Sequence, residues 1–317
     1  MIGNRRDFLS ACFDKAIEAV QPSSCIAKFI PDPPRGRTVV IGAGKASAAM
    51  AKSLEKYFKG PLTGTVVTRY GYNVQCEFIN VIQASHPIPD ETGVRAAKII
   101  LEEVQDLTED DLVICLISGG GSSLLTLPAS DLTIIEKQLI NKKLLICGAT
   151  VSEINTVRKH ISRIKGGQLA LACLPAPVLT LAISDVVGDD PSVIASGPTV
   201  PDRSTCDQAL KILEKYEITE PKSILKYLRS KKKVESKLAP KAFNKFKFEM
   251  IANNRMALEA SANFAKKSGI TPIILDEGLQ GEAKKMGYDL ADEVQKYINA
   301  KPCLLLSGGE LTVNVTE

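Results

Sequence analysis

Small residues that could bind an anion follow an apolar run between Leu112 and Leu125. The run LVICLI is followed by Ser118, Gly119, Gly120, Gly121, Ser122 and Ser123. Three consecutive glycines leave main-chain N–H groups uncovered by side chains, and such groups bind anions. A helix that begins near Ser122 or Ser123 would add unpaired amides. A tight turn needs fewer glycines, so we predict an anion site here.

A lysine follows two glycines in the segment TVVIGAGKASAAM, residues 38–50. Gly42 and Gly44 stand at the expected exit of a strand, with Lys45 at the start of an alanine-rich helix. The spacing differs from that of a Walker A loop, and Ser47 replaces the third glycine of a dinucleotide fingerprint. A lysine ammonium near helix-end amides suits charge stabilisation on a transferring phosphoryl group. A solvent-exposed lysine is the alternative interpretation.

Carboxylates gather after another expected strand, in SDVVGDDPSVIASGPT at residues 184–199. Magnesium prefers carboxylates together with phosphate oxygens and waters, so Asp185 and Asp189 are candidate ligands of a nucleotide-bound ion. The same side chains could instead cap the turns that follow. The residue types alone leave both interpretations open.

Basic residues crowd the segment NTVRKHISRIKGGQ, residues 155–168. They are Arg158, Lys159, Arg163 and Lys165. A solvated helix face that ends at a glycine cap is the default interpretation, and contact with a substrate carboxylate or phosphate is the alternative. His86 stands at a strand exit, where a turn or a ligand role is open. The spacing of the two histidines and the cysteines indicates no Cys and His pair.

Strands alternate with helices along the chain, which predicts parallel strands joined by crossover helices. The expected strands are 38–41, 64–68, 78–83, 112–117, 178–183, 248–252, 272–275 and 303–306. The expected helices are 8–20, 45–58, 91–104, several segments within 131–172, 255–267 and 282–298. The fold class is therefore α/β with a three-layer sheet. The last strand runs into Gly308, Gly309 and Glu310. Together with the serine that precedes them, these residues repeat the Ser-Gly-Gly motif of the first site.

Length, charge and cysteine usage narrow the class of protein. A chain of 317 residues exceeds the size at which single cores stop growing, so we expect two domains, at 1–240 and 241–317. The net charge of +4 gives no reason to expect a nucleic acid or a membrane as partner, and the basic segment 221–247 is interpreted as solvated surface. Eight scattered cysteines favour a reducing cytosol, with Cys115 and Cys147 as small core residues.

Several ordered motifs together resemble those of one enzyme family. They are GAGKAS at 42–47, SHPIPDE at 85–91, SGGGSSL at 118–124, NTVRKHISRIKGGQLA at 155–170 and the aspartate-rich segment at 184–199. The family is that of the class II glycerate kinases, ATP-dependent glycerate 2-kinases long also labelled hydroxypyruvate reductases. The resemblance implies a Rossmann-like N-terminal domain, a second α/β domain and an active site in the cleft between them.

The resemblance also implies a reaction and roles for particular residues. The γ-phosphoryl group of ATP would pass to the 2-hydroxyl of D-glycerate with Mg²⁺ as cofactor. Lys45 matches the family's catalytic lysine, and Ser118–Ser122 and the loop that contains Asp189 match segments that line the cleft. Lys45 and Asp189 are therefore the expected catalytic residues. The residues Gly42, Gly44, Ser123 and 308–310 would complete the nucleotide-binding set.

One departure from the family pattern bears on activity. The family continues beyond SGGE at 307–310 through a GRGGRNQE-like segment with an essential arginine, whereas this sequence stops at Glu317. We therefore expect an incomplete second domain and weak activity unless a complementing C-terminal chain supplies the segment, and a homodimer also stays open. The alternatives are an NAD(P)H-dependent hydroxypyruvate reductase, which the partial glycine fingerprint and Arg69 favour, and a non-catalytic remnant or split subunit.

Overall fold

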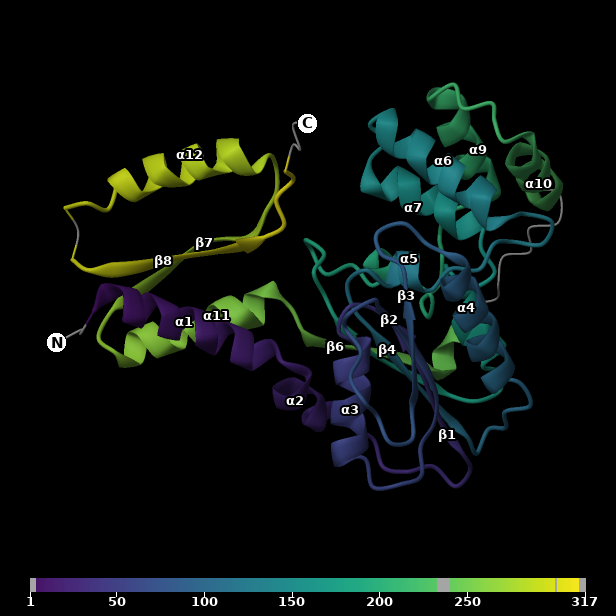
Figure 1. Ribbon diagram of the computed structural model, residues 1–317, viewed down its shortest axis with the longest axis horizontal. Helices are drawn as coiled ribbons and strands as arrows, with labels where there is room; N and C mark the ends of the chain where they lie inside the picture. Colours follow the sequence, from purple (N-terminus) through teal and green to yellow (C-terminus); the bar gives the residue numbers. More distant parts are fainter. Residues whose placement is uncertain (1–3, 233–239, 300, 314–317) are drawn as a thin grey trace. The chain divides into compact units, whose positions relative to one another are not determined.

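The computed structural model describes residues 4–232, 240–299 and 301–313 (Figure 1). Contacts within the chain divide it into two units that are each discontinuous in sequence. The larger unit comprises 26–183 and 190–250, and the smaller unit comprises 1–25, 184–189 and 251–317. This division by contacts does not test whether 1–240 and 241–317 fold as domains, so the predicted boundary stays a prediction.

Six strands form the main sheet, in the order β3-β2-β1-β4-β5-β6. Their bounds are β1 (Thr38–Ala43), β2 (Thr63–Arg69), β3 (Asn80–Ala84), β4 (Leu112–Ile117), β5 (Val178–Ile183) and β6 (Phe246–Ala252). The pairs β3-β2, β2-β1, β1-β4 and β4-β5 are parallel. In this doubly wound order the chain reverses direction of progress between β1 and β4, and the crevice beyond the carboxyl ends of those two strands is where such sheets bind ligands.

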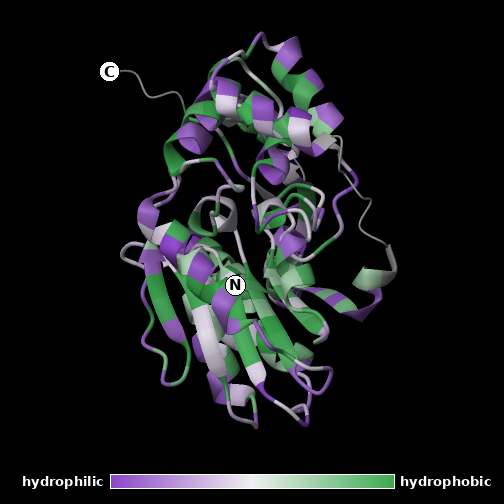
Figure 2. Ribbon diagram, turned by 90° about the vertical axis from the view of Figure 1, so that its right-hand side faces the viewer, coloured by the Kyte–Doolittle hydropathy of each residue, from purple (hydrophilic) through white to green (hydrophobic). Residues whose placement is uncertain are grey.

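The central strands are apolar because both faces of the sheet are covered. Every residue of β1 is buried, and so are five of the six residues of β4. Figure 2 shows these strands in the hydrophobic colour along most of their length. Helix α3 (Ser47–Tyr57) packs on β1, β2 and β4, and helix α4 (Glu91–Glu103) packs on β2 and β3. Near-continuous burial of this kind is typical of parallel strands between helices, and it confirms the predicted α/β class.

Four helices of the larger unit share a separate apolar core. They are α6 (Ile134–Ile146), α7 (Val151–His160), α9 (Cys206–Lys215) and α10 (Lys222–Lys232). Ile140, Val157, Leu213 and Leu228 are among the buried residues of this core. Helix α10 lies in the basic segment 221–247, of which residues 233–239 fall outside the described residues. Capping boxes begin α6, α7 and α9, so each start is encoded locally by a threonine followed three residues later by Glu or Gln.

Short helical turns connect these elements. They are α2 (Pro22–Cys25), η1 (Ile26–Phe29), α5 (Gly121–Leu124), α8 (Gln168–Ala172), η2 (Ile194–Ser196) and η3 (Pro240–Lys245). Within the described residues, no helix is both long enough and apolar enough to cross a membrane.

The smaller unit combines the first helix of the chain with its last elements. Helix α1 (Arg5–Val20) packs on α11 (Asn254–Lys267), which in turn packs on the parallel strands β7 (Thr271–Leu279) and β8 (Cys303–Gly309). Helix α12 (Ala283–Gln295) connects these two strands. The Phe8 and Phe264 rings stack with centroids 6.1 Å apart beside the buried Cys12.

Cys115 and Cys147, which were both predicted to be core residues, differ in burial. Cys115 is fully buried in β4, and this burial raises the pKa of its thiol well above the usual value. Cys147 is exposed, because it lies at the C-terminal cap of α6, where the helix leaves its apolar core. The prediction is therefore confirmed for Cys115 and wrong for Cys147.

Candidate functional site

The turns that follow β1 and β4 lie against each other at the reversal point of the sheet. The Lys45 amide donates to the Gly119 carbonyl at 2.8 Å, and the Ala46 amide donates to Ser118 Oγ at 3.0 Å. A Cβ atom at Gly44 would stand 2.0 Å from Ser118 Oγ, so only glycine permits this approach. The structure thus brings Gly44, Lys45 and the 118–121 turn together, while Gly42 lies within β1.

The two turns differ in the main-chain donors that they offer. The amides of Gly44, Lys45 and Ala46 all donate to protein oxygens. Among the described residues, no acceptor is found for the amides of Gly119 and Gly120. Helix α5 has only four residues, too few to provide the helix-end field that the glycine run suggested. The turn after β4 therefore supplies the amide donors of this site.

Gly120 separates two side chains at the site. Its φ is +82°, and an added Cβ would stand 2.8 Å from His86 Cδ2 and 3.3 Å from Lys45 Cγ. Lys45, Gly120 and His86 thus come from three different strand ends and meet at one turn. The glycine is required both for its left-handed backbone and for this close approach.

We expect Gly120→Ala to displace His86 and Lys45 as well as strain the backbone. The matched control is Gly71→Ala, because Gly71 has a φ of +80° and no atom within 4 Å of an added Cβ. The control should lose about 1–2 kcal/mol of unfolding free energy from the left-handed conformation alone. Gly120→Ala should lose measurably more in urea denaturation. Equal losses in the two variants would contradict the crowding that the structure indicates.

A polar cavity of about 200 Å³ lies next to this turn. It is lined by His86, Pro87, Pro89, Gly120, Ser122, Ser123, Thr126, Lys137, Asn141, Arg158 and Lys165. None of these lining residues is acidic, whereas three are lysine or arginine. An enclosed group of cations without a carboxylate favours an anionic ligand.

Lys165 is buried and held by oxygens of the turn after β4. Its Nζ donates to the carbonyls of Ser122 at 2.7 Å and Leu125 at 3.2 Å, and to Ser122 Oγ at 3.3 Å. Burial, with Lys137 and Arg158 nearby, lowers the pKa of Lys165 well below its usual value. The interpretation of this basic segment as a solvated face is therefore wrong for Lys165, which is 1% exposed.

Lys137 was not identified from the sequence, although it is the most unusual group of the cavity. It is 2% exposed, and its Nζ has no hydrogen-bond partner among the described residues. Burial, together with the nearby Arg158, lowers its pKa to about 7. Arg158 is oriented by a 2.9 Å bond from its Nε to Asn141 Oδ1. The signal that could have revealed Lys137 is its helical spacing from the buried Ile134, Ile140 and Leu144.

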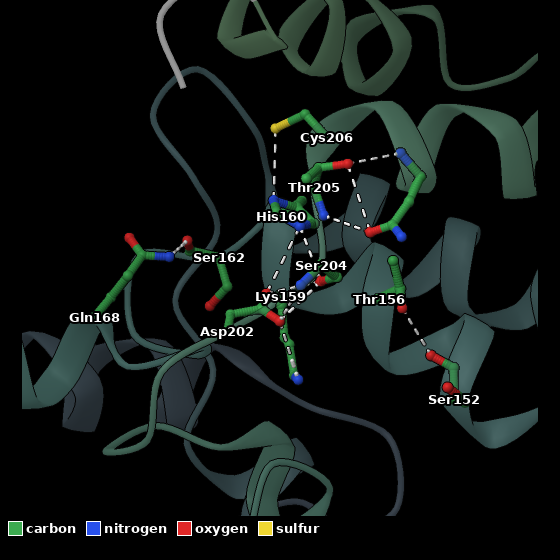
Figure 3. A network of polar contacts seen from close by, with 11 residues as sticks. Ser152, Thr156, Lys159, His160, Ser162, Gln168, Asp202, Ser204, Thr205 and Cys206 are labelled. Carbon is green, nitrogen blue, oxygen red and sulfur yellow. Dashed lines mark hydrogen bonds and ion pairs between the residues drawn. The ribbon is translucent and has the colours of Figure 1, made fainter. Parts of the chain in front are cut away.

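The end of α7 is fixed by a network of polar contacts (Figure 3). Lys159 Nζ lies 3.4 Å from Asp202 Oδ1, and His160 Nε2 lies 3.1 Å from Ser204 Oγ. His160 Nδ1 also lies 3.5 Å from Cys206 Sγ, a Cys and His contact that the sequence spacing did not indicate. Lys159 is buried in this ion pair, so it too departs from a solvated face, whereas Arg163 is exposed.

Residues 184–189 of the aspartate-rich segment, which contain Asp185 and Asp189, belong to the smaller unit, and residues 190–199 belong to the larger unit. Asp189 Oδ2 accepts a 2.6 Å bond from Asn253 Nδ2, and Asn253 Oδ1 in turn caps α11 at the Met256 amide. Asp189 adopts a φ of +52°. Within the described residues, no group of three or more His, Cys, Asp or Glu side chains could hold a metal. The assignment of Asp185 and Asp189 to a metal stays a prediction.

The second Ser-Gly-Gly segment is part of a strand rather than a turn after it. Gly308 and Gly309 lie in β8, and Gly309 pairs with Leu279 of β7. The Glu310 amide donates to the Leu279 carbonyl at 3.1 Å. The strand extends further than expected because glycines still pair through their main chain. A nucleotide-binding role for Gly308, Gly309 and Glu310 stays a prediction.

Comparisons with known proteins assign the chain to a family. Residues 8–229 match the family described as "Domain of unknown function (DUF4147)". The chain is 37% identical to the D-glycerate 2-kinase of Thermotoga maritima, over 95% of this chain and 72% of that protein. The chain therefore belongs to the family described as DUF4147, which includes this kinase's relatives. A relative from Agrobacterium vitis that is 46% identical, over 98% of this chain and 71% of that protein, carries the name "Putative hydroxypyruvate reductase", so both names occur in the family.

A solved structure of the family has the same fold. The crystal structure of glycerate kinase from Thermotoga maritima matches with a TM-score of 0.84 at 35% identity, over 98% of this chain and 75% of that chain. The predicted resemblance to the glycerate kinases is thereby confirmed, and so is an α/β fold with a six-stranded sheet and a second small sheet.

Proposed function

We propose that this chain is a kinase that transfers the γ-phosphoryl group of ATP to the 2-hydroxyl of D-glycerate, giving ADP and 2-phosphoglycerate. The observation that carries the proposal is the meeting of Lys45 with the 118–121 turn at the reversal point of the sheet, in a family with relatives named glycerate 2-kinase. The assignment of the reaction to the 2-hydroxyl, and not to another hydroxyl of glycerate, rests on the names of those relatives.

Phosphoryl transfer requires the protein chiefly to position the two reactants and to stabilise the negative charge of the transferring group. The 2-hydroxyl oxygen attacks the γ-phosphorus, the bond to the β–γ bridging oxygen breaks, and the hydroxyl proton is released. The Lys45 ammonium stabilises the negative charge on the transferring group, and the amides of Gly119 and Gly120 donate to its oxygens. Preorganised donors of this kind supply most of the catalysis in such reactions.

Magnesium would be bound as a complex with the nucleotide. Such an ion needs one or two protein carboxylates besides phosphate oxygens and waters. Asp185 and Asp189 are the side chains that we propose would hold it, and Asn253 would orient the carboxylate of Asp189. When bound, the ion neutralises phosphate charge.

A phosphorus NMR assay of the full chain tests this function. With ATP, Mg²⁺ and D-glycerate, we expect the signals of ADP and 2-phosphoglycerate to appear together, and neither to appear without glycerate. If ATP stays unchanged under these conditions and NADPH is oxidised when hydroxypyruvate is added, the chain is a reductase and not a kinase. Slow turnover of this polypeptide alone stays a prediction, which a turnover of about 10 s⁻¹, typical of enzymes, would contradict.

A further inference from the structure

Two of the buried polar atoms without a hydrogen-bond partner among the described residues belong to side chains that line the same cavity. They are Lys137 Nζ and Thr126 Oγ1, and both residues are at most 2% exposed. Leaving a buried donor unsatisfied costs about 1–3 kcal/mol, and more for a charged group. Buried polar groups of this kind are generally satisfied by bound water, an ion or a ligand. The cavity is therefore built for a partner that accepts hydrogen bonds.

The remaining lining determines the charge and size of that partner. Lys165 donates to three protein oxygens, so its Nζ is already engaged by the turn after β4, while Arg158 presents a planar guanidinium anchored at Asn141. The volume of about 200 Å³ is below the roughly 300–1,000 Å³ of pockets that hold drug-sized ligands. A small anion fits these properties better than a nucleotide does.

We propose that this cavity binds the carboxylate of a small hydroxy acid, with Lys137 and Arg158 as its cationic partners and Thr126 as a hydroxyl donor. Gly120 lines the cavity, and a Cβ added there would stand 3.3 Å from Lys45 Cγ, so an acid held here would have its hydroxyl end near the phosphoryl-transfer turn. The inference rests on the proposed function for the identity of the acid, D-glycerate. Binding itself does not require turnover.

The protonation state of the Lys137 amine makes binding of the acid dependent on pH. The charged or titratable groups that line the cavity with it are Arg158, Lys165 and His86, and all three are basic. Because the pKa of Lys137 is about 7, much of the free protein has a neutral amine above that pH. A carboxylate requires the ammonium, so binding takes up a proton there. Affinity for the acid should fall on the order of tenfold or more between pH 6.5 and 8.5.

The test is isothermal titration calorimetry of the full chain with D-glycerate, glycerol and inorganic phosphate. Lys137→Met should weaken D-glycerate binding about 10- to 100-fold, as expected for the loss of a charged hydrogen bond. Thr126→Val should weaken it about threefold to tenfold. Lys142→Met, an exposed lysine on the same helix, is the matched control and should change the affinity less than twofold. The pH dependence should be present in the wild type and absent in Lys137→Met.

Thermal unfolding separates a ligand-binding lysine from a structural one. Lys137→Met replaces an unpartnered buried charge by an apolar chain of similar length, so the free variant should melt at a higher temperature than the wild type. The increase should be largest below about pH 7, where both the folded and the unfolded wild type hold the proton. It should shrink toward pH 10.5, because wild-type stability rises with pH between the two pKa values.

Each result bears on one proposal. Unchanged D-glycerate affinity in Lys137→Met, or binding of glycerol as tight as that of D-glycerate, would overturn the carboxylate site. Phosphate binding that depends on Lys137, without any binding of D-glycerate, would overturn the assignment to a carboxylate. Glycerate binding that depends on Lys137 in a protein without kinase activity would retain this inference and refute the proposed function.

Discussion

Lys45→Met should lower the rate of phosphoryl transfer to D-glycerate about 100- to 1,000-fold, the usual effect of removing one transition-state donor. A Cβ added at Gly120 would stand 3.3 Å from Lys45 Cγ, and the amides of Gly119 and Gly120 in the same turn have no acceptor among the described residues. Methionine keeps the length of the chain and removes the charge, so the fold should be preserved. The measurement is the initial rate of ADP formation at saturating ATP and D-glycerate.

Two further measurements make the Lys45 result specific. Lys98→Met removes an exposed lysine from α4 and should leave the rate within twofold. D-glycerate affinity should be nearly unchanged in Lys45→Met, because the proposed carboxylate partners Lys137, Arg158 and Thr126 line the cavity and Lys45 is not among its lining residues. A Lys45→Met enzyme with the wild-type rate would remove Lys45 from the mechanism.

Lys165→Met should destabilise the chain by roughly 2–4 kcal/mol, opposite in sign to Lys137→Met. The two lysines are similarly buried, but Lys165 satisfies the carbonyls of Ser122 and Leu125 whereas Lys137 has no partner. Removing Lys165 leaves those carbonyls without their donor, at about 1–3 kcal/mol each, and relief of the buried charge offsets part of this. Urea denaturation gives the free energy of unfolding of both variants.

The comparison between these lysines is controlled by the exposed Lys142. Lys142→Met should change the free energy of unfolding by no more than about 0.5 kcal/mol. If Lys165→Met proves as stable as the wild type, the three oxygens around its Nζ do not hold the turn after β4. Similar effects of the Lys137 and Lys165 variants would likewise show that hydrogen bonding does not distinguish them.

Periodicity predicted the elements of this fold well because the signal is local. The run LVICLI and the apolar β1 gave strands whose burial on both faces needs no knowledge of partners. Helix α10 was missed because the segment 221–247, with ten Lys or Arg residues against one acid, was interpreted from its charge, although Ile224 and Leu228 are both buried at i,i+4 spacing. The amino-acid composition of such a helix reflects its charged, solvent-facing side and does not reveal the apolar side that packs against other helices.

The site was predicted only as far as main-chain chemistry determines it. Glycines after β1 and β4 indicated close backbone approach, and the structure confirms that the two turns touch. Buried lysines could not be recognised from a run of charges, because what buries Lys165 are oxygens some forty residues earlier in the chain. Nor could sequence spacing reveal the contact of His160 with Cys206, which depends on how α7 and α9 pack.

The stacking of Phe8 on Phe264 has a consequence for synthesis on the ribosome. Helix α1 is synthesised before α11, the helix that packs on it, and residues 21–253 must be made between them. At about 5–20 residues per second the delay is roughly 10–50 s. During that interval Phe8 and Cys12 have no native surface to cover them, so nascent α1 is a target for chaperones, and the smaller unit can form only after the larger one has left the exit tunnel.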